Sequence, residues 1–451
     1  MMRGILLLLA TLGGGPDGAA SPGALEGRPS AENASTLQAR VDEAPAGSTI
    51  DVGPGTYAGD LVLDRPVTLV GRGRPRLLGS GTGSVVRIRA AGVTVAGLDI
   101  DGRGGGDLGR DPSGIHVSAP DATIRDCRIG GTLFGVYLYQ AHRARVEGCE
   151  IRGIPGKEPG EKGSGIHVWN TEGFRLAGNE ITGVRDGLYI QSSTGGRIEN
   201  NTARDLRYGL HFMFSDDNVF EDNLFENGAA GAALMYSRRI VFRRNRFLHN
   251  RGFASVGLLL KACDDVVAES NLIADNARGV FLEGSNRGIF RGNVVAESDS
   301  GIVLYDSCQE IRFEGNSFVE NFTPLTFVGR RTDTRFEGNY WSDDGGVDCD
   351  GDGRNDLPHR LSSVFDHLRG NLTAADLFTR TFAAAALATA ERALPVLEPV
   401  GVEDLAPLAR PPRLPDVPAP AESSARPSPA GLAGCAAAFL LGSAILARGR
   451  T

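Results

Sequence analysis

Residues 201–222 read NTARDLRYGLHFMFSDDNVFED, and units of this length and pattern recur along most of the chain. Asn201 belongs to a column of asparagines separated by 22, 22, 22, 26, 22, 23 and 23 residues. The column comprises Asn179, Asn201, Asn223, Asn245, Asn271, Asn293, Asn316 and Asn339. A glycine column that includes Gly209 keeps the same step, even across the single insertion of four residues. Two columns that shift together indicate one unit stacked many times, which is a solenoid.

The residues within each unit predict strands rather than helices. Apolar residues alternate after each column glycine, as in Gly209-Leu210-His211-Phe212-Met213, and this pattern is typical of a strand with one buried face. Three short strands per coil of about 22 residues predict an all-β, right-handed parallel β-helix over residues 35–360. In this fold the column asparagines point inward and bond to backbone groups of the neighbouring coils.

Two further columns place serines and cysteines inside the coil. The serine column consists of Ser193, Ser215, Ser237, Ser285 and Ser307, with Cys263 at the equivalent position of one coil. Upstream, Leu98, Cys127 and Cys149 continue the asparagine column. These cysteines are therefore predicted to be buried residues of the stack. Cys127 and Cys149 lie on adjacent coils within nominal disulfide reach, and the sequence leaves open whether they are bridged.

The ends of the chain carry separate signals. Residues 1–20 resemble a secretory signal peptide, because a short apolar run follows Arg3 and ends in small residues. Residues 37–44 form a short amphipathic pattern that predicts a helix closing the first coil. After the repeats we expect a helical extension at 361–398 and a Pro-rich linker at 399–430.

Residues 431–447 are mostly small or apolar, and Arg448 and Arg450 follow them. This length is at the lower limit for a membrane span, with the arginines on the cytoplasmic side. A tail that lies on the membrane surface or is cleaved is the alternative. The net charge is −8 and no basic stripe is present, so nucleic-acid binding is not expected.

Three motifs in the middle of the chain resemble the central signature of the NosD family. They occupy residues 207–215 (RYGLHFMFS), 231–237 (GAALMYS) and 257–261 (GLLLK), and their order and spacing agree with the family. Residues 53–57 and 67–71 are similar to the family's opening coils, and residues 338–342 and 348–353 to its closing segment. The resemblance covers about residues 35–400, and the terminal segment from Pro411 departs from it.

The resemblance implies a periplasmic accessory protein, associated with the inner membrane. Family members work with an ABC transporter, composed of a permease and an ATPase, in assembly of the copper–sulfide centre of nitrous oxide reductase. A copper chaperone is a further expected partner. The helical region 361–398 resembles the part of the family that docks on the permease.

The β-helix register identifies the side chains that face outward. Positions two and four after each column glycine point away from the core. Met213 and Met235 occupy position four on adjacent coils, and Met1 and Met2 are the only other methionines. Because thioethers suit Cu(I), we predict that Met213, Met235 and the nearby His211 form a transient Cu(I) site.

Methionines and aromatic residues are also typical of protein-docking surfaces, so a docking role is the competing interpretation of the same face. The two interpretations do not exclude each other. The predicted partner surface consists of His167, Trp169, Tyr189, Phe214 and Tyr236.

A second metal site is predicted near the end of the repeats. Asp348, Asp350, Asp352 and Asp356 occupy positions 1, 3, 5 and 9 of a calcium-loop spacing, and the carbonyl of Arg354 occupies position 7. The usual bidentate glutamate at position 12 is replaced by His359. The loop therefore predicts either a structural calcium site or an acidic turn without metal.

Many β-helices cleave or epimerise polysaccharides, and a lyase, hydrolase or epimerase is the alternative function. Such enzymes need clustered carboxylates, or a carboxylate with a basic partner, along one outward groove. The two outward columns contain a single acid, Glu283, and its neighbour Lys261 predicts a salt bridge. We therefore expect a scaffold without catalytic turnover. A cell-surface adhesin is a third possibility.

Overall fold

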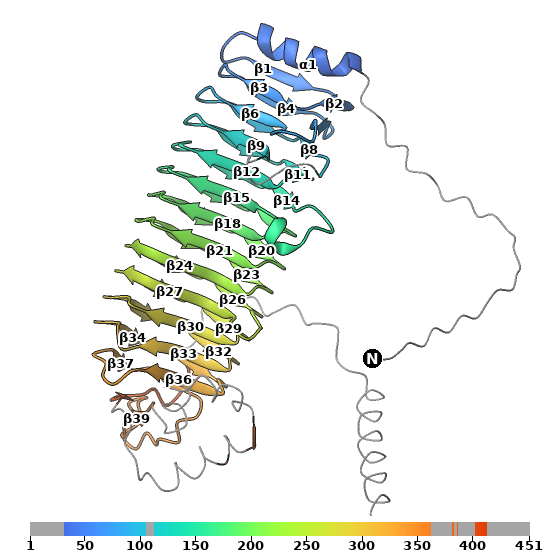
Figure 1. The fold of residues 1–451 in the computed structure, drawn as a ribbon. Coiled ribbons are helices and arrows are strands. Elements are labelled where there is room, and N and C mark those ends of the chain that lie inside the picture. Colours follow the sequence, from blue (N-terminus) through green and yellow to red (C-terminus); the bar gives the residue numbers. More distant parts are fainter. Residues whose placement is uncertain (1–30, 105–111, 362–380, 383–385, 387–401, 413–451) are drawn as a thin grey trace, which may run out of the picture.

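The computed structural model describes residues 31–104, 112–361, 381–382, 386 and 402–412. The chain winds as a parallel β-helix in which every third strand joins the same sheet, giving sheets A, B and C with 15, 13 and 12 strands (Figure 1). Each turn of the helix adds one strand to each sheet. The solenoid predicted from the asparagine and glycine columns is therefore confirmed.

The three sheets have the following members, in order along each sheet. Sheet A contains β1 (Thr49–Val52), β4 (Thr68–Gly71), β7 (Thr94–Ala96), β10 (Thr123–Arg125), β13 (Arg145–Glu147), β16 (Arg175–Ala177), β19 (Arg197–Glu199), β22 (Val219–Glu221), β25 (Val241–Arg243), β28 (Val267–Glu269), β31 (Ile289–Arg291), β34 (Arg312–Glu314), β37 (Arg335–Glu337), β40 (Glu403–Asp404) and β39 (His359–Arg360). Sheet B contains β2 (Thr56–Ala58), β5 (Arg76–Leu78), β8 (Asp99–Asp101), β11 (Arg128–Gly130), β14 (Glu150–Arg152), β17 (Glu180–Thr182), β20 (Thr202–Arg204), β23 (Leu224–Glu226), β26 (Arg246–Leu248), β29 (Leu272–Ala274), β32 (Val294–Ala296), β35 (Ser317–Val319) and β38 (Tyr340–Trp341). Sheet C contains β3 (Leu61–Leu63), β6 (Val86–Ile88), β9 (Ser113–Val117), β12 (Phe134–Tyr139), β15 (Ser164–Trp169), β18 (Asp186–Gln191), β21 (Tyr208–Met213), β24 (Ala230–Arg238), β27 (Val256–Asp264), β30 (Arg278–Glu283), β33 (Ser300–Tyr305) and β36 (Thr323–Val328). The described residues include the helix α1 (Ala31–Glu43) and the short 3₁₀ helix η2 (Pro159–Glu161).

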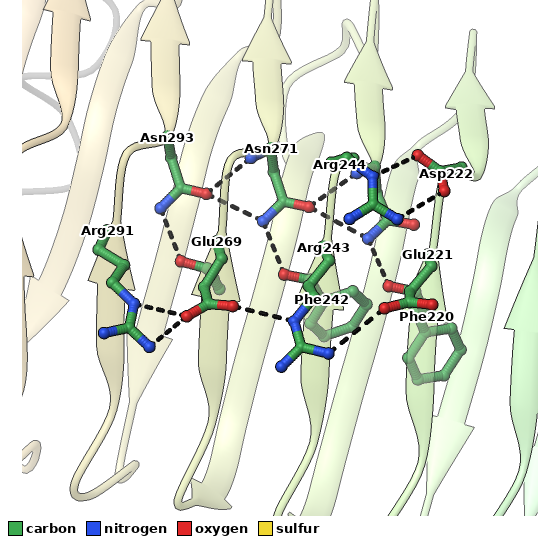
Figure 2. Close-up of polar contacts among 12 residues, drawn as sticks. Phe220, Glu221, Asp222, Phe242, Arg243, Arg244, Glu269, Asn271, Arg291 and Asn293 are labelled. Atoms are coloured by element: carbon green, nitrogen blue, oxygen red, sulfur yellow. Dashed lines mark hydrogen bonds and ion pairs between the residues drawn. The ribbon is translucent and has the colours of Figure 1, made fainter. Parts of the chain in front are cut away.

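The column asparagines form a continuous hydrogen-bonded row inside the coil. Asn271 Nδ2 donates to the Phe242 carbonyl (3.1 Å) and to Asn293 Oδ1 (2.9 Å), as Figure 2 shows. Asn271 Oδ1 in turn accepts from the backbone N–H and the Nδ2 of Asn245 (2.9 and 3.1 Å). The predicted inward ladder is therefore confirmed, and each amide satisfies backbone groups at a turn that sheet pairing leaves open.

The glycine column has a steric cause. A Cβ atom built at Gly187, Gly209 or Gly231 would lie 2.6–2.7 Å from the carbonyl oxygen of the next glycine in the column. Such a distance is far below van der Waals contact, so any side chain here forces adjacent coils apart. The glycines are required by close stacking of the coils.

On the outer side of sheet A, charged residues pair from coil to coil. Arg243 bridges Glu221 (3.3 Å) and Glu269 (2.9 Å), and Arg244 makes two 2.8 Å bonds to Asp222 (Figure 2). These side chains are partly exposed, so each pair contributes little to stability. Their mutual neutralisation leaves this flank without a strong charge of one sign.

The serine and cysteine columns are confirmed with one correction. Ser193, Ser215, Ser237 and Ser285 are buried, but Ser307 is exposed and Cys308 takes the inward position. The Ser285 N–H donates to Cys308 Sγ (3.5 Å). The step is 23 residues here because this coil contains one extra residue. Cys127 and Cys149 are both buried and are not bridged.

At the N-terminal end, α1 closes the first coil, as predicted. The helix begins at Ala31 rather than at residue 37, and its buried residues Leu37 and Val41 join the core. Gln38 exchanges hydrogen bonds with the backbone of Val62 (3.1 and 3.0 Å). This side chain therefore satisfies backbone groups at an open sheet edge, which reduces the risk of edge-to-edge association.

At the C-terminal end, the predicted linker boundary at residue 399 is wrong for residues 402–412, because these residues return to the β-helix. β40 pairs in parallel with β37 and antiparallel with β39. The Asp404 side chain is fully buried against Asn339 and Trp341. A sequence rich in proline cannot show this return, because it depends on pairing across more than sixty residues.

The predicted signal peptide (1–20) and membrane segment (431–447) lie outside the described residues, as does nearly all of the predicted helical extension (361–398). In the part of the chain that the structure describes, no helix is both long and apolar enough to cross a membrane.

Candidate functional site

The outer face of sheet C contains the predicted site residues, and the strands expose them as the register predicts. In β21, Leu210 and Phe212 are buried, whereas His211 and Met213 are partly exposed. The same alternation holds in β15 and β18, where His167 and Tyr189 are the partly exposed residues at position two.

Met213 and Met235 are direct partners in the parallel pairing of β21 with β24. Both are partly exposed, and adjacent parallel strands place them about 4.8 Å apart along the coil axis. His211 lies two residues before Met213 on the same face, and its own partner in β24 is Ala233. The structure therefore brings the three predicted copper ligands onto one small area; copper binding itself stays a prediction.

Charged residues of the next coil border the methionine pair. Lys261 is the register partner of Met235, and its Nζ lies 3.0 Å from a carboxylate oxygen of Glu283. The predicted cross-coil salt bridge is therefore present. The exposed methionine pair lies between an aromatic region on one side and an ion pair on the other.

The aromatic region is a row of ring contacts along position two of sheet C, stacked from His116 to Tyr189 and edge-on between Tyr189 and His211. Centroid distances are 5.3 Å for His116–Tyr137, 4.4 Å for both Tyr137–His167 and His167–Tyr189, and 4.7 Å for Tyr189–His211. Burial, followed by the positive charge of Arg185, lowers the pKa of His167 to about 3. His167 is therefore neutral at physiological pH and behaves as one more aromatic ring of the stack.

Phe214 and Tyr236, together called the aromatic shelf, stand beside the methionine pair. Their rings stack at 5.1 Å with an interplanar angle of 9°, and about half of each side chain is exposed. Trp169 is also exposed, two coils before Phe214. The structure thus exposes three of the predicted partner-surface residues, while His167 and Tyr189 belong to the ring stack.

The aromatic shelf occupies a turn with a left-handed backbone. Phe214 and Tyr236 have φ values of 49° and 54°. The equivalent residues of other coils have similar φ values, namely Gln140, Asn170, Ser192, Ala262 and Gly284. A bulky residue is costly in this region, so the two aromatic residues are maintained against a conformational preference. Such strain is typical of functional positions.

The sequence reading missed a buried charged residue beneath this face. Asp186, the first residue of β18, is fully buried beneath this face. It accepts two hydrogen bonds from Arg207 (2.8 and 2.6 Å), and its Oδ2 lies 3.4 Å from His211 Nδ1. Asp186 lies outside the two outward columns, directly before a column glycine. The available signal was an acidic residue directly before a column glycine. In the next coil the equivalent residue is Tyr208, and Arg207 directly precedes it.

An open cleft of about 690 Å³ borders the same face. The four-residue insertion seen in the sequence forms one wall, including Arg251 and the highly exposed Phe253. The opposite lining includes Tyr208, Ala230 and Ala233. The hollow exists because this one coil has alanine where the preceding coil has Tyr208 and His211.

The acidic loop is only partly assembled as predicted. Carboxylate oxygens of Asp348, Asp350 and Asp352 lie within 4.8 Å of one another, a spacing that a metal ion could bridge. Asp356 instead accepts a hydrogen bond from the Cys349 N–H (2.7 Å). His359, at the position of the usual glutamate, lies 3.6 Å from Asp343 and 3.4 Å from Asp344.

The loop also holds itself together. The Arg354 N–H, for example, donates to Asp352 Oδ1 (2.8 Å), and both oxygens of Asp348 accept from glycine amides. Side chains that already bond to the backbone are typical of turns with or without metal. Calcium binding by Asp348, Asp350, Asp352, Arg354 and Asp356 therefore stays a prediction.

Sequence comparison gives one family match and two close relatives. Residues 153–346 match the family model described as periplasmic copper-binding protein (NosD). The chain is 36% identical to the probable ABC transporter binding protein NosD of Pseudomonas aeruginosa, over 79% of this chain and 87% of that protein. It is 34% identical to the protein of the same name from Stutzerimonas stutzeri, over 78% and 85% of the two chains.

Structural comparison finds β-helix enzymes with low sequence identity. The A-module of the mannuronan C-5 epimerase AlgE6 from Azotobacter vinelandii superimposes with a TM-score of 0.49 at 17% identity, over 70% of this chain and 91% of that module. A family 28 exopolygalacturonase from Yersinia enterocolitica gives a TM-score of 0.50 at 13% identity, over 67% and 75%. At these identities the likeness concerns the fold alone.

Proposed function

Because the chain belongs to the NosD family, we propose that it acts in the periplasm as an accessory protein of an ABC transporter, in assembly of the copper–sulfide centre of nitrous oxide reductase. In this role the protein is a scaffold that handles copper and receives partners, without catalytic turnover of its own. The expected partners are the permease and ATPase, nitrous oxide reductase and a copper chaperone. The predicted helical extension (361–398) and the predicted membrane segment (431–447) are the proposed contacts to the permease and the inner membrane.

The single observation that carries the copper part of the proposal is the pairing of Met213 with Met235 beside His211. Two thioethers and an imidazole are soft or borderline donors that suit Cu(I). The next residues in register are Ala233, beside His211, and Lys261, beside Met235. Neither of these residues places a carboxylate directly beside the donors. The donor set therefore fits Cu(I) better than hard divalent cations.

Anaerobic titration with Cu(I) tests this site. The variant carrying Met213→Leu and Met235→Leu keeps apolar volume but removes both sulfurs. We expect its Cu(I) affinity to fall by at least about tenfold for each lost ligand, or roughly 1.4 kcal/mol per ligand. Trp169→Leu, which changes the same outward column two coils earlier, is the control and should bind like wild type. Equal affinity of wild type and the double-methionine variant would remove the copper site.

Docking is the second part of the proposal, and the aromatic shelf supports it. Exposed aromatic residues dominate the energetics of protein interfaces. The predicted surface runs from Trp169 along the rings of His167 and Tyr189 to Phe214 and Tyr236. Phe214 and Tyr236 directly follow Met213 and Met235 in the chain. A partner that covers the shelf would also cover the copper donors, so docking and copper transfer would take place at one location.

Replacing both shelf residues by asparagine should separate stability from binding. Asparagine tolerates φ near 50°, as Asn170 does in an equivalent turn. Relief of strain at two residues, about 2 kcal/mol, exceeds the roughly 1 kcal/mol lost with the stacked pair. We expect denaturation to show a net gain of about 1 kcal/mol, while binding to the purified copper chaperone or nitrous oxide reductase weakens. A variant that loses stability and keeps its partners would contradict the assignment.

The β-helix fold is compatible with a polysaccharide-acting enzyme, but the carboxylates of this face are not placed for such catalysis. Asp186 is closed to solvent and held by Arg207, and Glu283 is paired with Lys261. A general base must reach the proton that it removes. Neither carboxylate is placed to do so, which is why we prefer the accessory role.

A further inference from the structure

The coil does not require a charged residue at the position of Asp186. The equivalent residues of the neighbouring strands, which pair with it in register or follow in the same row, are Ser164, Tyr208, Ala230 and Val256. All four are uncharged, although their strands pair in the same register. Replacing a buried ion pair by uncharged residues often leaves a protein equally stable. The carboxylate at this one coil therefore needs an explanation other than folding.

One contact of Asp186 reaches the imidazole of His211. Asp186 Oδ2 lies 3.4 Å from Nδ1 of that ring. The rings of Tyr189 and Tyr208 meet the imidazole edge-on at 4.7 and 5.3 Å. Together the carboxylate and the two tyrosines restrict both the tilt and the rotation of the ring.

The other ring nitrogen is left available. Among the described residues, His211 Nε2 has no hydrogen-bond partner, yet it is not among the buried unpaired side-chain atoms, whereas Nδ1 of His167 is. The Nε2 atom is therefore not sealed in the core, and His211 lies on the same partly exposed face of β21 as Met213. A histidine that binds a metal through one nitrogen typically donates its other N–H to a carboxylate, which fixes the tautomer.

We propose that Asp186 is the positioning residue of the copper site: it accepts the Nδ1–H of His211 and so presents the Nε2 lone pair to Cu(I). This inference rests on the proposed copper-handling function and extends it to a residue beneath the surface. Asp186 itself does not touch the ion.

Arg207 has a defined part in this arrangement. It binds both oxygens of Asp186 and lies 4.4 Å from the ring centre of Tyr208. The Nε atom of Arg185 also donates to Asp186 Oδ2 (3.3 Å). The two guanidinium groups hold the carboxylate in place, and its Oδ2 lies within reach of the His211 ring.

A double-mutant cycle on Cu(I) affinity tests the proposal in the full-length protein. The four proteins are wild type, Asp186→Asn, His211→Gln and the variant with both changes, each titrated anaerobically against a colorimetric Cu(I) chelator. Asp186→Asn should weaken Cu(I) binding by about 10- to 100-fold in the presence of His211. In the His211→Gln background the same change should have no further effect, because the group through which Asp186 acts is gone.

Asp217→Asn is the matched control, because Asp217 makes an equivalent two-bond pair with Arg239 (2.6 and 2.8 Å) on an exposed turn. It should leave Cu(I) affinity unchanged. Equal losses from Asp186→Asn with and without His211 would show a purely structural role and overturn the proposal. If wild type itself fails to bind Cu(I), the copper function falls and this inference with it. If wild type binds and Asp186→Asn binds equally well, only the inference fails.

The tautomer gives an independent readout without copper. Long-range ¹H–¹⁵N correlation spectra of the metal-free protein should show His211 protonated at Nδ1, with the signal assigned by its loss in His211→Gln. Asp186→Asn should shift this signal toward a mixture of tautomers. Protonation at Nε2 in the wild type would overturn the proposal.

Discussion

Replacing Asn223 by leucine is expected to lower the free energy of unfolding by about 4 kcal/mol, because several buried groups lose their partners at about 1–3 kcal/mol each. Asn223 Oδ1 accepts from the N–H and the Nδ2 of Asn201 (both 3.0 Å). Its Nδ2 donates to the Ile198 carbonyl (2.8 Å) and to Asn245 Oδ1 (2.9 Å). Leucine has a similar volume, so the loss measures hydrogen bonding rather than a cavity.

Denaturant unfolding followed by circular dichroism measures this loss. The matched control is Asn200→Gly, in the preceding coil, where the asparagine is exposed and has a φ of 53°. Glycine accepts this φ, so the control should remain within about 0.5 kcal/mol of wild type. A loss below about 1 kcal/mol for Asn223→Leu would mean that water or backbone shifts satisfy the ladder groups.

The second large effect is expected at the far end of the same row. Asp404 Oδ2 accepts from the N–H and Nδ2 of Asn339 (both 2.9 Å) and from Trp341 Nε1 (3.1 Å). Its Oδ1 accepts from the N–H groups of Gly338 (3.0 Å) and Ala406 (3.2 Å). Asparagine has nearly the same shape as aspartate. In the Asp404→Asn variant, however, its NH₂ group would face at least two of these N–H donors and leave them without an acceptor. The expected cost is about 3 kcal/mol.

This cost should appear locally rather than in the whole molecule. In a solenoid each coil contacts only its neighbours, so damage to the last coil opens that end first. Hydrogen exchange should accelerate in β37, β38 and β40 while the amides of β21 stay protected. Glu403→Gln, at an exposed position of the same strand, is the control and should change neither region. Uniform acceleration along the chain would contradict local opening.

The fold was predictable because its determinants are local and repeated. The positions of Asn223 and Gly209 in their columns define the coil, and simple alternation then assigns His211 and Met213 to the outer face. The ladder hydrogen bonds follow from the same register. Even the misplacement of Ser307 is informative, since one extra residue in a turn moved the inward position to Cys308.

Other features were not predictable, because they depend on contacts between coils or distant segments. The buried Asp186 is paired with Arg207, which comes from the next coil. The return of residues 402–412 requires pairing with β37, which no local pattern encodes. The strain at Phe214 and Tyr236 is a backbone property that residue types alone do not reveal. The copper donors were therefore visible in the sequence, while the groups that hold and expose them were not.

The asparagine row also has a direction. Each side-chain amide, from Asn179 to Asn316, points its oxygen toward the preceding coil and donates from its nitrogen to the oxygen of the next. The amide dipoles are therefore aligned head to tail, with partial positive charge at the C-terminal end. The backbone N–H of Cys149 meets the negative end (3.0 Å), and the carboxylate of Asp404 meets the positive end. The aligned amides give the solenoid a net dipole along its axis. The carboxylate of Asp404, which the chain brings back from a distant segment, lies at the positive end of this dipole.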